Sequence, residues 1–123
     1  MKTLLTIGLI GLGFAAPAAA ELPAQVEGDL RCITILSAAT GNIPEGPQRL
    51  QMAAAVMYFV GRVDGVSPTI DLKAEIKRIV PSLLATKMAD EANRCAAILT
   101  DKSAKLQELG KALQEEGKAQ GAK

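Results

Sequence analysis

An uncharged apolar stretch in the middle of the chain constrains its fold more than any other feature. Residues 52–60 carry no charge and consist only of Ala, Val, Met, Tyr and Phe. Pro47 suits the first turn of a helix, and Gly65 suits the residue just past its end. A helix that is apolar all round has to be covered on every side, and this run is well short of the roughly 20 residues that cross a bilayer. We therefore predict a core helix that begins at Pro47 and ends at about Val63, with Met57 in the interior and other segments packed around it.

The N-terminus has the pattern of a bacterial signal peptide over residues 1–20. Lys2 precedes an apolar run over residues 3–14, and small residues at Ala18 and Ala20 stand where a signal peptidase reads the chain. We predict cleavage after Ala20, with cleavage after Ala18 as the second choice. Cleavage would leave no stable membrane anchor and would place the mature protein in the periplasm or outside the cell. The alternative is an uncleaved anchor, for which the run is near the lower limit of length.

The two cysteines, Cys32 and Cys95, are an even number in a small exported domain. In an oxidising compartment this count predicts a disulfide. A bond between residues 63 positions apart would stabilise the fold by about 4 kcal/mol through the entropy of the unfolded chain. The alternative is two separate free thiols, each buried as a small apolar side chain.

The remaining segments also show helical spacing of apolar residues. A first helix is predicted over residues 26–39 and a third over residues 71–80, which Pro81 would end. A further stripe predicts a fourth helix whose inward face carries Cys95, so the first and fourth helices should be neighbours. The members of this stripe are Leu84, Met88, Ala92, Cys95 and Leu99.

The predicted fold class is all-α, a small bundle of four to five helices tied by one disulfide. After the signal peptide, Tyr58 and Phe59 are the only aromatic residues, so aliphatic and alanine side chains have to form the core. Such a core favours closely packed helices over a β-sandwich. We predict a single helical domain over residues 21–116, followed by a disordered tail over residues 117–123.

The composition argues against most kinds of catalytic and metal-binding site. The chain has no His, which is the commonest general base near neutral pH and the commonest metal ligand. Asp64 and Asp71 could in principle do acid–base work, but both fall at predicted helix ends, where capping is the ordinary role. We therefore predict no catalytic residue, no metal site, no cofactor and no enzymatic activity. Lys2 is the only charge in the signal peptide, so the remainder has 13 basic and 13 acidic residues and no excess to attract nucleic acid.

The end of the central helix is the first candidate interaction patch, made of Tyr58, Gly61, Arg62 and Asp64. The phenol of Tyr58 needs a polar partner, and Gly61 leaves a flat surface that another chain could approach. The alternative is that the glycine marks a close contact between two helices of this chain, followed by a capped helix end.

Part of this segment resembles the helical periplasmic immunity proteins of the Rap/Tai type. The resemblance rests on Tyr58, Gly61 and Asp64, spaced three apart, and on the stripe ending at residues 79–81; it covers residues 53–82. It implies a small secreted helical domain that neutralises a peptidoglycan amidase, although no cysteine soon follows the aspartate here as it does in those proteins. The layout alone is also similar to HdeA-like acid-stress chaperones, and more generally to small exported proteins of α-proteobacteria.

The C-terminal segment is the second candidate contact surface. Leu106, Leu109 and Leu113 form an apolar stripe that little of the remaining chain is left to cover. The stripe would bind an unknown protein partner in the cell envelope or a second copy of the chain, or it would fold back on the domain.

Together these features predict a non-catalytic periplasmic protein that acts through protein–protein contacts, of the inhibitor or immunity type. The alternatives are a periplasmic chaperone and a small-ligand carrier. The carrier would need an enclosed cavity beside Tyr58, Arg62 or Asp64.

Overall fold

The computed structural model describes residues 21–121, which form four helices and no strand. The predicted signal peptide lies outside these residues. In chain order the helices are α1 (Ala24–Gly41), α2 (Pro47–Val66), α3 (Leu72–Leu84) and α4 (Met88–Gly121). The all-α class and the disulfide between Cys32 and Cys95 are therefore confirmed.

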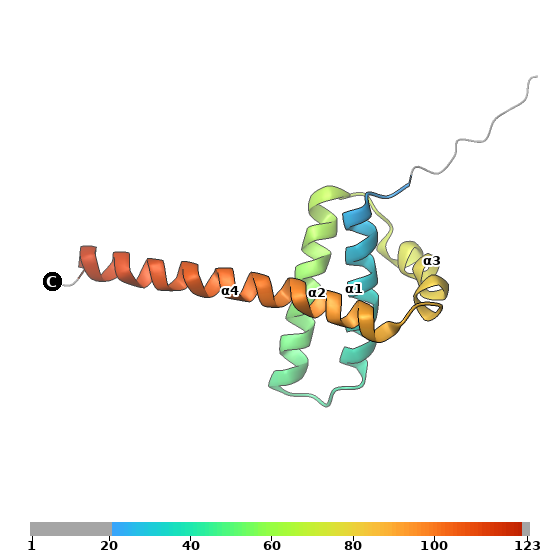
Figure 1. Ribbon diagram of the computed structural model, residues 1–123, viewed down its shortest axis with the longest axis horizontal. Coiled ribbons are helices and arrows are strands. Elements are labelled where there is room, and N and C mark those ends of the chain that lie inside the picture. Colours follow the sequence, from blue (N-terminus) through green and yellow to red (C-terminus); the bar gives the residue numbers. More distant parts are fainter. Residues whose placement is uncertain (1–20, 122–123) are drawn as a thin grey trace, which may run out of the picture.

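The helix at the centre of the fold is α1. It contacts each of α2, α3 and α4, and Figure 1 shows it between α2 and α3 with α4 crossing it. Its buried aliphatic side chains are Val, Leu and Ile, which supply much apolar area to the core. The buried residues of α1 are Val26, Asp29, Leu30, Cys32, Ile33 and Ile35.

The prediction that the helix from Pro47 to about Val63 is the core helix was wrong, although the helix itself is there. Of the residues of α2, only Phe59 and Val63 are buried, and these two lie one turn apart on one face. Met57, expected in the interior, is 65% exposed. Three consecutive alanines fill much of the uncharged stretch, and Ala offers little apolar area to bury. The absence of charge therefore indicated a helix but not its position in the bundle.

The third helix begins as predicted and ends later than predicted. The Asp71 carboxylate accepts a hydrogen bond from the backbone N–H of Ala74 at 3.0 Å, which is a helix N-cap. Pro81, expected to end the helix, lies inside α3, and Leu84 is the last residue. Ile79 and Leu83 are almost fully buried on either side of Pro81. Their burial offsets the backbone hydrogen bond that a proline inside a helix removes.

The fourth helix has two unlike halves. Cys95 is fully buried against α1 in the first half. From residue 100 to residue 121 every residue is exposed except Gly110, which is half-buried. Figure 1 shows this second half extending away from the other three helices. We call residues 100–121 the α4 arm; it continues as helix five residues beyond 116, where the sequence predicted that the domain would end.

Candidate functional site

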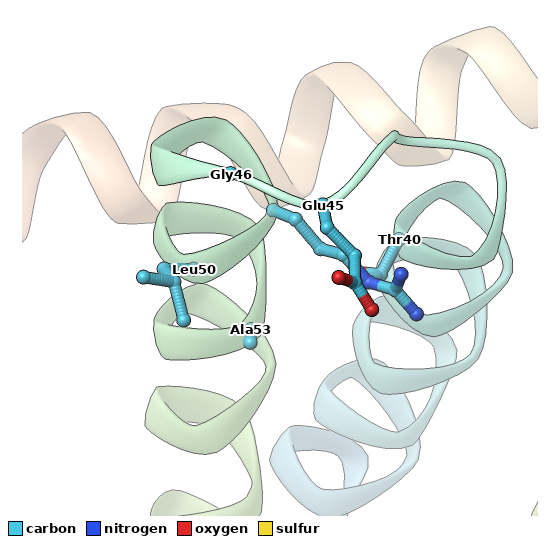
Figure 2. A pocket seen from close by; sticks show the side chains of 6 residues that line it. Thr40, Glu45, Gly46, Leu50 and Ala53 are labelled. Carbon is cyan, nitrogen blue, oxygen red and sulfur yellow. The ribbon is translucent and has the colours of Figure 1, made fainter.

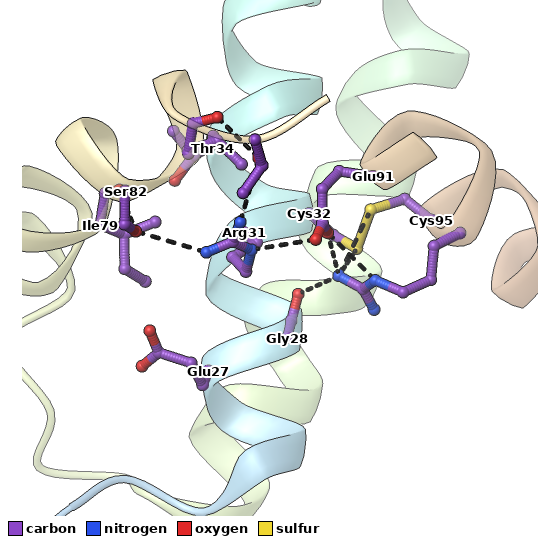
Figure 3. A network of polar contacts seen from close by, with 12 residues as sticks. Glu27, Gly28, Arg31, Cys32, Thr34, Ile79, Ser82, Glu91 and Cys95 are labelled. Atoms are coloured by element: carbon purple, nitrogen blue, oxygen red, sulfur yellow. Dashed lines mark hydrogen bonds and ion pairs between the residues drawn. A yellow bond between two sulfur atoms is a disulfide. The ribbon is translucent and has the colours of Figure 1, made fainter. Parts of the chain in front are cut away.

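The disulfide joins α1 to α4 at the base of the arm. Cys32 and Cys95 are both fully buried, and their sulfurs are 2.06 Å apart. Beside them, Arg94 Nη2 donates hydrogen bonds to the Gly28 carbonyl oxygen at 2.8 Å and to Cys32 Sγ at 3.4 Å. The same nitrogen lies 3.0 Å from Glu91 Oε2 and 3.9 Å from Cys95 Sγ. Figure 3 shows the disulfide between Cys32 and Cys95, with Gly28 and Glu91 near it. This junction is a structural site, because no face of the disulfide is open to a substrate.

Three charged residues of α1 connect it to the three other helices. Arg78 Nη2 of α3 lies 2.6 Å from Glu27, Arg62 Nε of α2 lies 2.9 Å from Asp29, and Arg31 Nε lies 3.2 Å from Glu91 of α4. Helical residues four apart share a face, whereas residues two apart point in nearly opposite directions. Glu27 and Arg31 therefore share one face of α1 and Asp29 lies on the opposite face, so the ion pairs hold α1 on two sides.

The structure brings together two of the four residues of the predicted interaction patch. Arg62 Nη1 donates a hydrogen bond to the Tyr58 hydroxyl at 3.2 Å, and its guanidinium carbon lies 5.6 Å from the centre of that ring. The hydrogen bond to Tyr58, with that to Asp29, raises the pKa of Arg62 above its ordinary value. The polar partner of the Tyr58 hydroxyl is therefore Arg62, in the same helix.

The other two residues of the patch, Gly61 and Asp64, are exposed on the surface of α2. A Cβ added at Gly61 would meet nothing within 4 Å, so Gly61 is not a close contact with another helix of this chain. The alternative explanation for this glycine is therefore wrong, and the exposed part of the patch remains a candidate surface.

Asp29 is a structural residue that the sequence analysis missed. It is 1% exposed and joins α1 to Arg62. The signal was present in the sequence, because a carboxylate stands directly before Leu30 on a helix whose apolar positions include Val26 and Ile33. An acidic residue on an apolar helix face usually has a cationic partner, because an unpaired buried charge is too costly.

Two shallow grooves lie where α1 and α2 meet near the connection between them. The larger has a volume of about 390 Å³ and opens beside Thr40, Gly46 and Leu50, as Figure 2 shows. The neighbouring groove, of about 360 Å³, extends along α2 to Met57. Both are open to solvent. They lie toward the N-terminal end of α2, whereas the small-ligand interpretation required an enclosed cavity beside Tyr58 or Asp64.

The α4 arm exposes the three leucines of the predicted C-terminal stripe. Leu106 is 67% exposed, Leu109 54% and Leu113 59%. The stripe therefore does not fold back on the body of the protein. Near the base of the arm, Lys105 Nζ lies 2.9 Å from Asp101 Oδ2; this hydrogen bond lowers the pKa of Asp101 and raises that of Lys105. The arm thus combines a helix-stabilising ion pair with an uncovered apolar face.

Residues 21–121 define a small all-α bundle with one disulfide and one projecting helix. None of their helices combines the length and the apolar character that a membrane span requires. They contain no group of three His, Cys, Asp or Glu side chains arranged to hold a metal ion. Neither a scan against protein-family models nor searches of curated proteins and of solved structures gave a match.

Proposed function

We propose that this protein is a non-catalytic protein of the bacterial periplasm that works by binding another protein chain through the α4 arm. The observation that carries the proposal is the exposure of Leu106, Leu109 and Leu113 on a helix that extends away from its own core. Fully burying a leucine is worth about 1.5–3 kcal/mol relative to leaving it in water. Covering this stripe would therefore provide a substantial part of the free energy of association.

The arm also has features of a helix that gains from a partner. An isolated helix is marginal in water even with good helix formers, because most helical stability in proteins comes from packing. The arm contains Gly110, Gly117 and Gly121, and each interior glycine costs about 1 kcal/mol relative to alanine. A partner that packed along the leucines would offset this cost.

The periplasmic location rests on two independent features. The N-terminal segment has the pattern of a signal peptide, and a buried disulfide is typical of oxidising compartments. The immunity-type role that the resemblance implies would require a cell-wall enzyme as a binding partner. Because Tyr58 and Arg62 bind each other, the leucine stripe supports the binding function better than that patch does.

The proposal is tested by placing a photo-crosslinking amino acid at Leu109 and, as a control, at Lys111, which is on the opposite face of the helix. Crosslinking is carried out in the periplasm with the full chain. We expect one adduct of defined mass from position 109 and none from position 111.

A second pair of variants tests whether formation of the adduct depends on the leucine stripe. Leu106→Lys places a charge among the leucines, whereas Ala104→Lys places the same charge on the far face. We expect the first to abolish the adduct and the second to preserve it. No adduct, or equal adducts from positions 109 and 111, would show that the arm is not the binding surface.

A further inference from the structure

We infer that the chain covering the leucine stripe is the α4 arm of a second copy of this protein, packed antiparallel. This inference rests on the proposed function, because it names the partner of the same surface. Four properties of the arm support it: the period of its apolar positions, the size of the neighbouring side chains, the order of charges along the stripe, and the length of the helix.

The period is that of a coiled coil. From Ala92 to Leu113, apolar side chains occupy one helical face at alternating steps of three and four residues, except at Lys102, which is the heptad pattern of paired helices; the same steps lead on to the polar Glu116 and Gln120. Within the body, α1 covers this face at the buried Cys95. In the arm the same face continues through the leucines and is uncovered. The positions are Ala92, Cys95, Leu99, Lys102, Leu106, Leu109, Leu113, Glu116 and Gln120; we call their arm portion the seam.

Most side chains beside the seam are small. Ser103, Gly110 and Gly117 flank it on one side at intervals of seven residues, and Lys105, Ala112 and Ala119 flank it on the other; of these six, only Lys105 is long. A Cβ added at Gly110 or Gly117 would meet nothing within 4 Å in this chain. Small flanking residues let a second helix approach closely, so that the leucines of each helix fit between those of the other.

The charges at the two ends of the seam indicate a second copy and fix its direction. Lys102 precedes the three leucines and Glu116 follows them. In an antiparallel pair with its two-fold axis near Leu109, Leu106 lies opposite Leu113 of the other copy, and Lys102 lies opposite Glu116. A parallel pair would place Lys102 against Lys102 and Glu116 against Glu116. The seam is therefore complementary to itself in the antiparallel direction, and self-complementarity is what a two-fold symmetric dimer requires.

The arm is long enough for this arrangement. Its residues 100–121 rise about 1.5 Å each and so extend about 32 Å from the body. With the axis near Leu109, Thr100 of one copy lies level with Lys118 of the other. The two Thr100 positions are then about 27 Å apart along the helices, so the bodies lie at opposite ends of the paired arms.

The experiment measures the mass of the mature protein in solution by sedimentation over a range of concentrations. We expect a reversible dimer that Leu109→Lys converts to monomer, while Lys111→Glu, on the far face, leaves it intact. Circular dichroism and the disulfide state show whether each variant has kept its fold. A monomer at every concentration, or a dimer unaffected by Leu109→Lys, overturns the inference.

Charge exchange tests the direction. In the antiparallel pair, Lys102→Glu or Glu116→Lys alone creates two like-charged contacts by symmetry, and each should weaken the dimer roughly tenfold at low salt. The double variant Lys102→Glu/Glu116→Lys restores opposite charges and should recover wild-type affinity. In a parallel pair both positions stay like-charged in the double variant, so the absence of this loss and rescue overturns the antiparallel arrangement.

The two proposals fail separately. A monomer that still gives a stripe-dependent adduct of a different protein in the crosslinking experiment overturns the inference and supports the proposed function. A monomer that gives no adduct overturns both.

Discussion

The Asp29 carboxylate accepts a hydrogen bond from Arg62 Nε at 2.9 Å, and this ion pair joins the central helix to α2. Asp29 has almost no contact with solvent, whereas the side chain of Arg62 is 27% exposed. The guanidinium also donates a hydrogen bond to Tyr58, so one arginine satisfies a buried acid and a phenol. Two residues that the sequence marked as a recognition patch therefore also hold the fold together.

Removal of Arg62 should destabilise the protein strongly. Arg62→Leu leaves Asp29 charged and unpaired in the core, and we expect a loss of about 3 kcal/mol in the free energy of unfolding. Urea denaturation followed by circular dichroism measures it. Arg78→Leu is the matched control, because its pair with Glu27 is largely exposed and should contribute less than about 1 kcal/mol. Equal losses in the two variants would contradict the distinction between the buried and the exposed pair.

Loss of the disulfide should also be costly. The bond links residues 63 positions apart, so Cys95→Ser should lower the free energy of unfolding by about 4 kcal/mol and reduce the melting temperature clearly. Reduced wild-type protein should melt close to the variant. If Cys95→Ser melted like the oxidised wild type, the disulfide would have no part in stability.

Phe59 and Met57 should respond very differently to truncation. Phe59 is fully buried between α2 and α1, and Phe59→Ala should cost about 3–5 kcal/mol. Met57 is exposed, so Met57→Ala should change stability by less than about 0.5 kcal/mol. Thermal melts of the two variants are the measurement. A large effect at Met57 would restore the interpretation of α2 as the core helix.

Pro81 should be a site at which the protein can be stabilised. It lies inside α3, where it lacks the N–H that would bond the carbonyl of Lys77. Pro81→Ala restores this bond, and we expect a gain of about 2 kcal/mol, because the greater freedom of the unfolded chain offsets part of the effect. Chemical denaturation tests it. A less stable variant would show that the proline fits α3 better than an ordinary helical residue.

The sequence predicted the helices and the disulfide because both leave local or countable signals. Spacing of apolar residues marked each helix, and two cysteines in a chain predicted to be exported left one pairing. The centre of the bundle was not predicted, since burial depends on which helices pack together. Of residues 52–60, which are uncharged, only Phe59 is buried, whereas six residues of α1 are buried, Asp29 among them. The charge of Asp29 made α1 look less like a core helix, although in the fold Arg62 pairs with this carboxylate.

The sequence rules for helix ends were reliable only where no buried side chain in a neighbouring turn keeps the chain helical. Asp71 caps α3 as predicted, because its carboxylate is exposed and free to turn back to the backbone. Pro81 and Gly65 lie inside helices instead of ending them, since the buried Leu83 and Val63 hold the neighbouring turns. Of the two candidate surfaces, the leucine stripe is exposed along its length, and a stripe without a covering segment is visible in the sequence; its role as a contact surface stays a prediction.

The central position of α1 has a consequence for what a single change can do to the fold. The contacts of α2, α3 and α4 are mainly with α1, so each of them depends on α1 for its place. One ion pair joins each of them to it: Arg62 to Asp29, Arg78 to Glu27, and Glu91 to Arg31. A change within α1 therefore disturbs every other helix at once, whereas a change in an outer helix first disturbs its own contact with α1.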